Sequence, residues 1–366
     1  MARFDSPFGI AFLADGSALV TEKAGHLKYW RSGSPVGEVG GVPAVAAGGQ
    51  GGLLGVALSP GFASDRLVYL SYSERSANGG SALALARGTL ASDASRLTAV
   101  RLLWHDPQGG KGGQFGGAIA IAPDGQSLFL SSGERQRFTP AQDPSQPLGK
   151  ILHLTLDGQP APGNALAGRD GAPTTSIASP PANSGAAKSA AGRPFHWATP
   201  NHTPAETWSS GHRNPYGLAF DADGRLWESE MGPQGGDEIN LIKSGHNYGW
   251  PNASNGSNYD DSDIPDHKPG DGYDPPKTYW NPSISPSGLM IYRGAIWPQW
   301  KGDAFVPALS AQALIRVHLA GETATKAEEW GLQGRIRAVA QSPAGDIYLL
   351  EDGDGARLLR LDPVRR

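Results

Sequence analysis

One sequence pattern recurs along this chain and constrains its fold more than any other feature. A small residue leads into an apolar strand, then a tight turn rich in Pro, Asp and Gly, then a second apolar strand. Clear copies begin at Gly9, Gly55, Gly117, Gly217 and Ile336, and a fainter copy covers residues 287–292. Asp-Gly between alternating apolar runs is a strong hairpin signal, because the turn needs a positive φ. Six copies predict an all-β fold, a six-bladed β-propeller with four-stranded antiparallel blades around a central channel.

The spacing of the copies is irregular, so a β-sandwich of similar length is the alternative architecture. The longest interval, from Gly117 to Gly217, contains residues 163–205, which are rich in Ala, Ser, Pro and Gly and lack strand periodicity. We interpret this segment, at about 163–205, as a flexible and exposed insertion. We therefore expect residues 1–366 to form a single propeller domain that carries one insertion.

The composition excludes several classes of function. The formal net charge of −4 offers no broad attraction to nucleic acid or to an anionic membrane, so an anionic ligand needs a local group of cations. The absence of cysteine excludes disulfides, thiolate metal sites and a cysteine nucleophile. No apolar run is long enough for a membrane span. The chain begins almost directly on strand-like sequence without a signal-peptide hydrophobic region, so we expect that a natural leader has been removed.

The stretch from Trp208 to Pro251 concentrates residues that can bind an anion beside a hard cation. Arg213 and Asn214 precede a predicted strand and offer a guanidinium and an amide. After the hairpin come Gly232 and Pro233, whose main-chain carbonyls suit calcium, although an ordinary Gly-Pro turn is the simpler interpretation. A strand, a turn and a returning strand bring both loops to the same rim of the blade.

Two other blade entrances carry polar side chains. Arg335 and Arg337 are two residues apart and thus on the same side of a strand, which favours a carboxylate or phosphate ligand, with plain solvent exposure as the alternative. Gln50 lies in the glycine-rich segment 49–55, which lacks the Gly-Lys-Ser/Thr of a phosphate-binding loop. These entrances are further candidates for ligand contacts.

Acidic residues follow the Gly-Pro turn in two places. Asp237 and Glu238 either add negative charge to a cation site or brace the loop. The segment 252–277 carries five aspartates among Asn, Gly and Pro, but it lacks the ordered spacing of an EF-hand. We interpret 252–277 as a solvated loop.

Four motifs in this region resemble the soluble quinoprotein glucose/sorbosone (aldose sugar) dehydrogenases. They are Gly211-His-Arg-Asn-Pro215, Ser229-Glu-Met-Gly-Pro233, Gly236-Asp-Glu-Ile-Asn-Leu241 and Asn247-Tyr-Gly-Trp-Pro251. The resemblance covers nearly the whole chain apart from the insertion. It implies a six-bladed propeller that is usually exported, hence periplasmic or secreted, and that holds pyrroloquinoline quinone (PQQ) with Ca²⁺. It also implies a sugar substrate, oxidised at the anomeric carbon by hydride transfer to PQQ, and an external electron acceptor.

The resemblance also assigns roles to individual residues. It implies that five side chains contact the quinone, namely Gln50, Arg213, Asn214, Arg335 and Arg337. It implies that the carbonyls of Gly232 and Pro233 bind calcium. PQQ is a tricarboxylate, which agrees with a local group of cations in a net-acidic chain.

The chain departs from the family at the catalytic position. The family's base is a histidine in a segment that here reads Gln114-Phe-Gly-Gly-Ala118, and the acidic residue that orients this histidine is Glu134 here. A neutral amide is no useful base at pH 7, and losing a positioned base commonly costs roughly 10² to 10⁴ in rate. A further cationic cofactor contact of the family is Ser310 in this chain.

Three interpretations of the altered site follow. Another base serves, for which Glu134, Asp143 and His105 are candidates; or the chain binds PQQ or a sugar without turnover; or Gln114 orients water or substrate in a dehydrogenase of different specificity. We favour a quinoprotein sugar dehydrogenase of unusual or reduced activity, with Gln114 and Glu134 at its catalytic position. A propeller interaction module that uses rim aromatics and a calcium-dependent lactonase-type hydrolase are the alternatives from other classes. The sequence carries no signal for an oligomeric state.

Overall fold

Six four-stranded antiparallel sheets form the framework of the computed structural model, which describes residues 2–179 and 190–363. The sequence repeats supply or adjoin the innermost strand of each sheet. These strands are β2 (Pro7–Phe12), β6 (Leu53–Leu58), β10 (Gly116–Ile121), β16 (Pro215–Phe220), β22 (Met290–Ile291) and β26 (Ile336–Gln341). Each contacts the next, and β26 contacts β2, so the six strands form a closed ring around the central channel. The predicted six-bladed propeller is therefore confirmed.

The remaining strands follow outwards from the channel in each blade. Blades 1 and 2 add β3 (Ala18–Glu22), β4 (His26–Trp30) and β5 (Gly37–Val39), then β7 (Leu67–Arg75), β8 (Ser81–Leu90) and β9 (Leu97–His105). Blades 3 and 4 add β11 (Ser127–Ser132), β12 (Lys150–Thr155) and β15 (Thr207–Ser210), then β17 (Leu226–Glu230), β19 (Asp237–Ile242) and β21 (Thr278–Trp280). Blade 5 adds β23 (Ala304–Ala308), β24 (Ala313–Ala320) and β25 (Thr323–Gly331). The apolar side chains of neighbouring blades pack into clusters that span each junction.

Helices are short in the described residues. They are α1 (Phe62–Asp65), α2 (Thr203–Glu206) and the 3₁₀ turns Thr139–Gln142 and Pro298–Trp300. Across 2–179 and 190–363, no helix has both the length and the apolar character that crossing a membrane requires.

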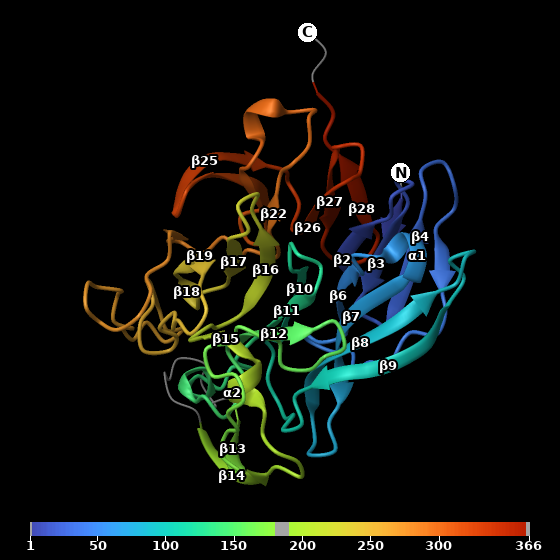
Figure 1. Ribbon diagram of the computed structural model, residues 1–366. Helices are drawn as coiled ribbons and strands as arrows, with labels where there is room; N and C mark the ends of the chain where they lie inside the picture. The colour runs from blue at the N-terminus through green and yellow to red at the C-terminus, as the bar shows by residue number, and fades with distance from the viewer. Residues whose placement is uncertain (1, 180–189, 364–366) are drawn as a thin grey trace.

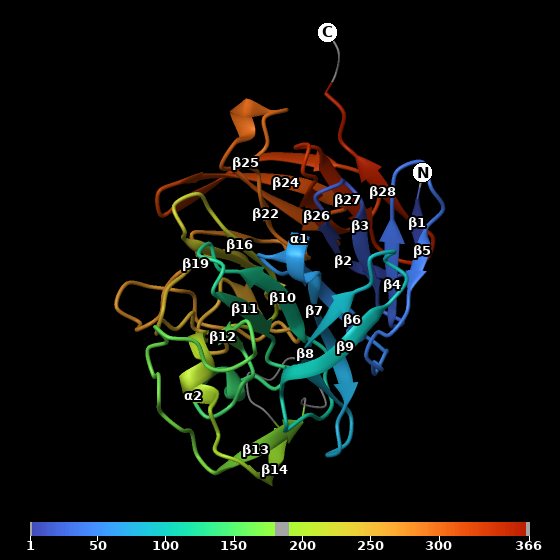
Figure 2. The same cartoon turned by 45° about the vertical axis from the view of Figure 1, so that its right-hand side comes forward.

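Both ends of the chain build blade 6. The C-terminal part supplies β26, β27 (Ile347–Glu351) and β28 (Ala356–Arg360), and β1 (Arg3–Phe4) pairs with β28 as the outer strand. Phe4 is 2% exposed and packs in a cluster with residues of β27 and β28. Figures 1 and 2 show the red last blade beside the blue first blade. This pairing closes the ring.

Buried hydroxyls join neighbouring blades. Ser71 Oγ on β7 accepts a hydrogen bond from Gly55 N at 2.8 Å in its own blade and donates to Gly117 O at 2.5 Å in the next. A Cβ atom on Gly55 would lie 2.3 Å from Gly117 O, so only glycine fits this close approach. Four further junctions have an equivalent hydroxyl bond, which joins Thr21 to Leu54, Ser131 to Pro215, Ser229 to Gly288 and Ser287 to Ile336.

The segment 163–205 lies outside the six blades and contains a two-stranded sheet that the composition did not predict. Its strands are β13 (Thr174–Ser179) and β14 (Ala190–His196), which project from the ring in Figures 1 and 2. Arg193 Nη2 donates to the carbonyl of Asn78, so the hairpin contacts the loop between β7 and β8. The flexibility of the insertion stays a prediction, and its residues 180–189 lie outside the described residues.

Ser71→Ala should destabilise the protein, because it leaves the buried Gly55 N–H and Gly117 carbonyl without their shared partner. We expect the free energy of unfolding to fall by about 1–3 kcal/mol, measured by urea denaturation. Ser64→Ala on the exposed face of α1 is the matched control and should change stability by less than about 0.5 kcal/mol. Equal effects of the two substitutions would contradict the bridging role of Ser71.

Candidate functional site

One end of the propeller gathers the loops that precede each innermost strand and follow each second strand. In blade 4, Pro215 of β16 lies opposite Glu230 of β17, which places the loops of Arg213 and Gly232 side by side. Arg213 Nη1 donates to Gly232 O at 2.5 Å. The expectation that these two loops meet at one rim is confirmed.

A cavity of about 440 Å³ opens at this end of the propeller. Three of the predicted residues line it, namely Gln50, Arg335 and Arg337. Lys23 and Asp352 line it as well. The cavity is therefore lined by charged side chains from blades 1 and 6 and by an amide from the entrance of blade 2.

The cations of this cavity outnumber its carboxylates. Arg335 Nε donates to Asp352 Oδ2 at 2.8 Å, and Arg337 Nη2 donates to Asp352 Oδ1 at 2.8 Å. Lys23 Nζ donates to the carbonyl of Gly49 at 2.7 Å. Burial, and then the nearby charge of Arg337, lower the pKa of Lys23. The lining thus holds three cations and only one carboxylate, so the cavity favours an anion.

The position of Asp352 changes the prediction that Arg335 and Arg337 are both free to bind an anionic ligand. Burial alone would raise the pKa of Asp352, but Arg337 and Arg335 outweigh burial and lower it. The two guanidinium groups therefore already hold a carboxylate of the chain itself, and only part of their charge is left for a ligand. The side chain of Arg335 is 50% exposed, whereas that of Arg337 is 9% exposed.

Gln50, Gln114, Glu134 and Arg213 form one hydrogen-bonded network beside the cavity. Gln114 N donates to Gln50 Oε1 at 2.6 Å. With its amide nitrogen towards Glu134 Oε1, Gln114 donates to that carboxylate, and its amide oxygen accepts from Arg213 Nη2 at 2.8 Å. Residues from three different blade entrances thus converge, and Gln114 separates a carboxylate from a guanidinium.

Glu134 is a fully buried carboxyl that also holds its own loop. Its oxygens accept hydrogen bonds from the backbone N–H groups of Gln136, Arg137 and Phe138. Burial raises the pKa of Glu134 to about 7, against the opposing effects of Arg213 and these backbone donors. Glu134 can therefore hold or release a proton near neutral pH, although it does not line the cavity.

The other two candidate bases lie elsewhere. His105 ends β9, the outer strand of blade 2, and its Nδ1 lies 2.5 Å from Glu74 Oε1. Asp143 accepts from Ser145 N at 2.8 Å within its own turn. Neither lines the cavity, and among the described residues no histidine does. The contacts therefore give no support to His105 or Asp143 as a base for this cavity, and both assignments stay predictions.

Two further positions singled out in the sequence have supporting contacts. Asn214 is 1% exposed, and its Oδ1 accepts from Gly116 N at 3.3 Å. Ser310 Oγ donates to Ser283 O at 3.1 Å next to the cavity residue Leu309. The structure therefore gives both residues partners within the chain and leaves the predicted quinone contact of Asn214 a prediction.

Asp237 braces the turn that contains Gly232 and Pro233. Asp237 Oδ1 accepts from Gly232 N at 2.8 Å, and its Oδ2 accepts from Ser285 N at 2.7 Å. A Cβ atom on Gly232 would lie 2.2 Å from Gly235 O, so the turn is closely packed around backbone carbonyls. Of the two roles that the sequence left open for Asp237, bracing is the one these contacts support.

Three residues that line the cavity were not predicted from the sequence, namely Lys23, Asp352 and Tyr259. Lys23 follows β3 and Asp352 follows β27, which are the second strands of blades 1 and 6, so the rule applied to Gly232 after β17 identifies both positions. Tyr259 lies in the segment 252–277, where it lines the cavity, and Arg213 Nη2 donates to its hydroxyl at 3.2 Å.

The interpretation of 252–277 as only a solvated loop therefore needs correction. The acidic residues 260, 261 and 263 are exposed, as expected for such a loop. However, β20 (Gly256–Ser257) pairs with β18 (Gln234–Gly235) directly after the Gly-Pro turn. This small sheet attaches the loop to the site.

Together, the closed ring of six blades and the cation-rich cavity at one end define a propeller with a built small-molecule site. The family model Glucose / Sorbosone dehydrogenase matches residues 4–179 and 184–360. The chain therefore belongs to the glucose/sorbosone dehydrogenase family, as its motifs indicate.

Known relatives agree with this assignment. Aldose sugar dehydrogenase YliI of Escherichia coli (strain K12) is 34% identical over 370 residues, which cover 99% of this chain and 91% of the relative. The crystal structure of the soluble aldose sugar dehydrogenase from Escherichia coli in the apo-form superposes with a TM-score of 0.85 at 34% identity, over 98% of this chain and 96% of the other. The PQQ-bound form of aldose sugar dehydrogenase from Streptomyces coelicolor has a TM-score of 0.74 at 29% identity, over 98% and 94%.

Glu134→Gln should change how stability depends on pH. The folded wild type, with a Glu134 pKa of about 7, keeps a proton that the unfolded chain releases near pH 4.5. Stability therefore falls as pH rises through this window, and the variant lacks that loss. Between pH 5 and 8 we expect the wild type to lose roughly 2 kcal/mol relative to Glu134→Gln in urea denaturation. Parallel pH profiles of the two proteins would contradict a raised pKa.

Proposed function

We propose that this protein is a PQQ-dependent sugar dehydrogenase that oxidises an aldose or a related sugar at the anomeric carbon. The excess of cations in the cavity carries the proposal, because Lys23, Arg335 and Arg337 line it together with only one carboxylate, that of Asp352. A tricarboxylate such as PQQ suits this charge balance. The cavity also has the usual volume of a small-molecule site. The PQQ-bound relative supports the same cofactor.

The chain's own residues would bind and orient the reactants. Lys23, Arg335 and Arg337 would bind the carboxylates of the cofactor. Gln50 would contact one edge of the cofactor. Its side chain is held in place because it accepts hydrogen bonds from Gln114 N and from the hydroxyl of Tyr216. When bound, PQQ supplies an acceptor for the hydride of the anomeric carbon and passes the electrons to an external acceptor. We also propose a periplasmic or secreted location, which the family resemblance implies.

We further propose that calcium binds at the carbonyls of Gly232 and Pro233. The carbonyl of Gly232 already accepts from the cationic guanidinium of Arg213, so its lone pairs face positive charge. A hard cation that prefers oxygen ligands suits such a position. Calcium at Gly232 would require Arg213 Nη1 to leave this carbonyl, and Met231 O, 2.9 Å away, remains its partner.

We propose that turnover is weak because the site lacks a free base. Gln114 is neutral, and its amide already bonds to Glu134 and Arg213. Glu134 has a suitable pKa, but it is fully buried. These contacts also favour a second candidate function, a propeller that binds PQQ or a sugar without turnover.

Equilibrium titration with PQQ tests the binding site. Because calcium and the cavity cations act together, we expect tight binding only when calcium is present. Lys23→Ala should raise the dissociation constant about tenfold or more, since it removes one of three cations. Lys243→Ala, an exposed lysine that pairs with Glu322, is the matched control and should bind as the wild type does. Absence of binding with calcium in excess would rule out the proposed function.

Gln114→His tests the catalytic position. Restoring an imidazole should increase aldose-dependent dye reduction by a factor of roughly 10² to 10⁴, because a positioned base contributes about that much. Gln126→His, in an exposed hairpin turn, is the control and should not change the rate. If wild type already oxidises glucose at ordinary enzyme rates, the missing-base argument is wrong. If Gln114→His binds PQQ with calcium but does not turn over, the binding protein is favoured.

A further inference from the structure

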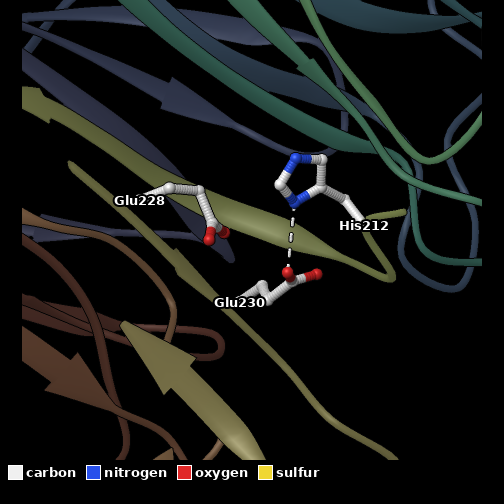
Figure 3. A group of neighbouring side chains, drawn as sticks. All are labelled: His212, Glu228 and Glu230. Atoms are coloured by element: carbon white, nitrogen blue, oxygen red, sulfur yellow. Dashed lines mark hydrogen bonds and ion pairs between the residues drawn. The ribbon is translucent and has the colours of Figure 1, made fainter. Parts of the chain in front are cut away.

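A compact group of buried polar side chains lies within blade 4. Glu228 and Glu230 come from β17, Glu238 comes from β19, and His212 precedes β16. The exposed fractions of the four residues are 0%, 4%, 6% and 0%. In Figure 3 the carboxyl groups of Glu228 and Glu230 and the ring of His212 point towards one another. One potential ligand atom from each of these three residues lies within 4.8 Å of the others.

The group has fewer hydrogen-bond donors than acceptors. Asn240 Nδ2 lies 3.1 Å from Glu228 Oε2, 3.2 Å from Glu230 Oε1 and 3.1 Å from Glu238 Oε2. An amide nitrogen carries two hydrogens, so it cannot donate to all three carboxylates. Glu228 Oε1 and Asn240 Oδ1 are also buried, and neither has a hydrogen-bond partner. The group therefore contains buried oxygen atoms that no hydrogen-bond donor satisfies.

Positive charge is also scarce here. His212 Nδ1 lies 3.1 Å from Glu230 Oε1, and among the described residues no Lys or Arg side chain pairs with Glu228, Glu230 or Glu238. Arg213 contributes only its backbone N–H to Glu230, at 2.6 Å, because its guanidinium donates to the carbonyls of Met231 and Gly232 instead. Buried carboxylates need a compensating cation or a proton.

We propose that these five residues, His212, Glu228, Glu230, Glu238 and Asn240, bind one divalent first-row transition-metal ion such as Zn²⁺ or Mn²⁺. Carboxylate oxygens and an imidazole nitrogen form a suitable ligand set, and the imidazole favours such ions over calcium. Turning the Asn240 amide would direct its oxygen inwards as a further ligand. The site uses none of the carbonyls proposed for calcium.

The proposed ion has a structural role. It would cancel the repulsion between carboxylates on β17 and β19 and would hold His212, the residue before Arg213. Since Glu230 also accepts from Arg213 N, the ion would stabilise the loop that holds Arg213 beside the cavity residue Tyr259. Metal binding should therefore raise the thermal stability of the protein.

Metal content and melting temperature test the proposal. Tag-free full-length protein is stripped with a chelator, dialysed against Zn²⁺ or Mn²⁺ and analysed by inductively coupled plasma mass spectrometry. We expect one retained equivalent and a higher Tm for the wild type. Glu228→Gln should weaken the uptake of the ion at least about tenfold and abolish the Tm shift, because it removes a charged ligand. Glu206→Gln, a glutamate bonded to Trp104 outside this group, is the control and should retain the ion.

The outcomes separate the metal site from a group that holds only protons. A wild type that takes up no ion, or a Glu228→Gln variant that takes up as much as the wild type, overturns the proposal. Glu228→Leu is a second variant, because an apolar side chain removes the ligand without leaving a buried polar group. If neither variant folds, electron paramagnetic resonance of Mn²⁺ added to wild type decides, and a spectrum of free hexaaqua Mn²⁺ alone rejects the site. None of these measurements depends on PQQ binding.

Discussion

The hydrogen bond from a buried hydroxyl in one blade to a backbone carbonyl of the next is the interaction on which this propeller depends. Innermost strands run close together around the channel, where water cannot satisfy every backbone group. Ser71 satisfies Gly55 N and Gly117 O at once, and Thr21 and Ser131 bond in the same way. Because each innermost strand begins at the cavity end, fixing the strands also fixes the entrances that carry Gln50 and Gln114.

Arg213 connects two regions of opposite charge. Its guanidinium contacts Gly232 O and Tyr259 beside the cationic cavity, while its backbone N–H bonds to Glu230 in the acidic group of blade 4. The motif Gly211-His-Arg-Asn-Pro215 thus links the cavity side of the blade to its charged interior, and a change in either region can shift the guanidinium.

The sequence was sufficient to predict the ring of blades and much of the site. The recurrent strand pattern identified the innermost strands, because their glycines permit the close approach that a propeller requires. The same pattern placed Arg213 and Gly232 at one rim. Lys23 and Asp352 were missed because the rule was applied to blade 4 and not to blades 1 and 6, where single charged residues follow the second strands.

Other features depended on contacts that residue spacing cannot reveal. The pair Arg335 and Arg337 indicated an anion, but only the fold shows that Asp352 already holds both. Gln114 stood out as a replaced base, yet its position between Glu134 and Arg213 arises from three separate loops of blades 3 and 4. The hairpin of β13 and β14 had no periodic signal, because its residues are mostly small or polar.

The pairing of β1 with β28 has a consequence for how the chain is made. β1 precedes all the other strands in the chain and β28 follows them, and they complete the same sheet. During translation the first five blades can form in order, but Arg3–Phe4 must wait for β28, its inner neighbour, to be made. Pairing of β1 is therefore a late step of folding, and a chain that stalls before residue 356 presents an unpaired edge at both ends.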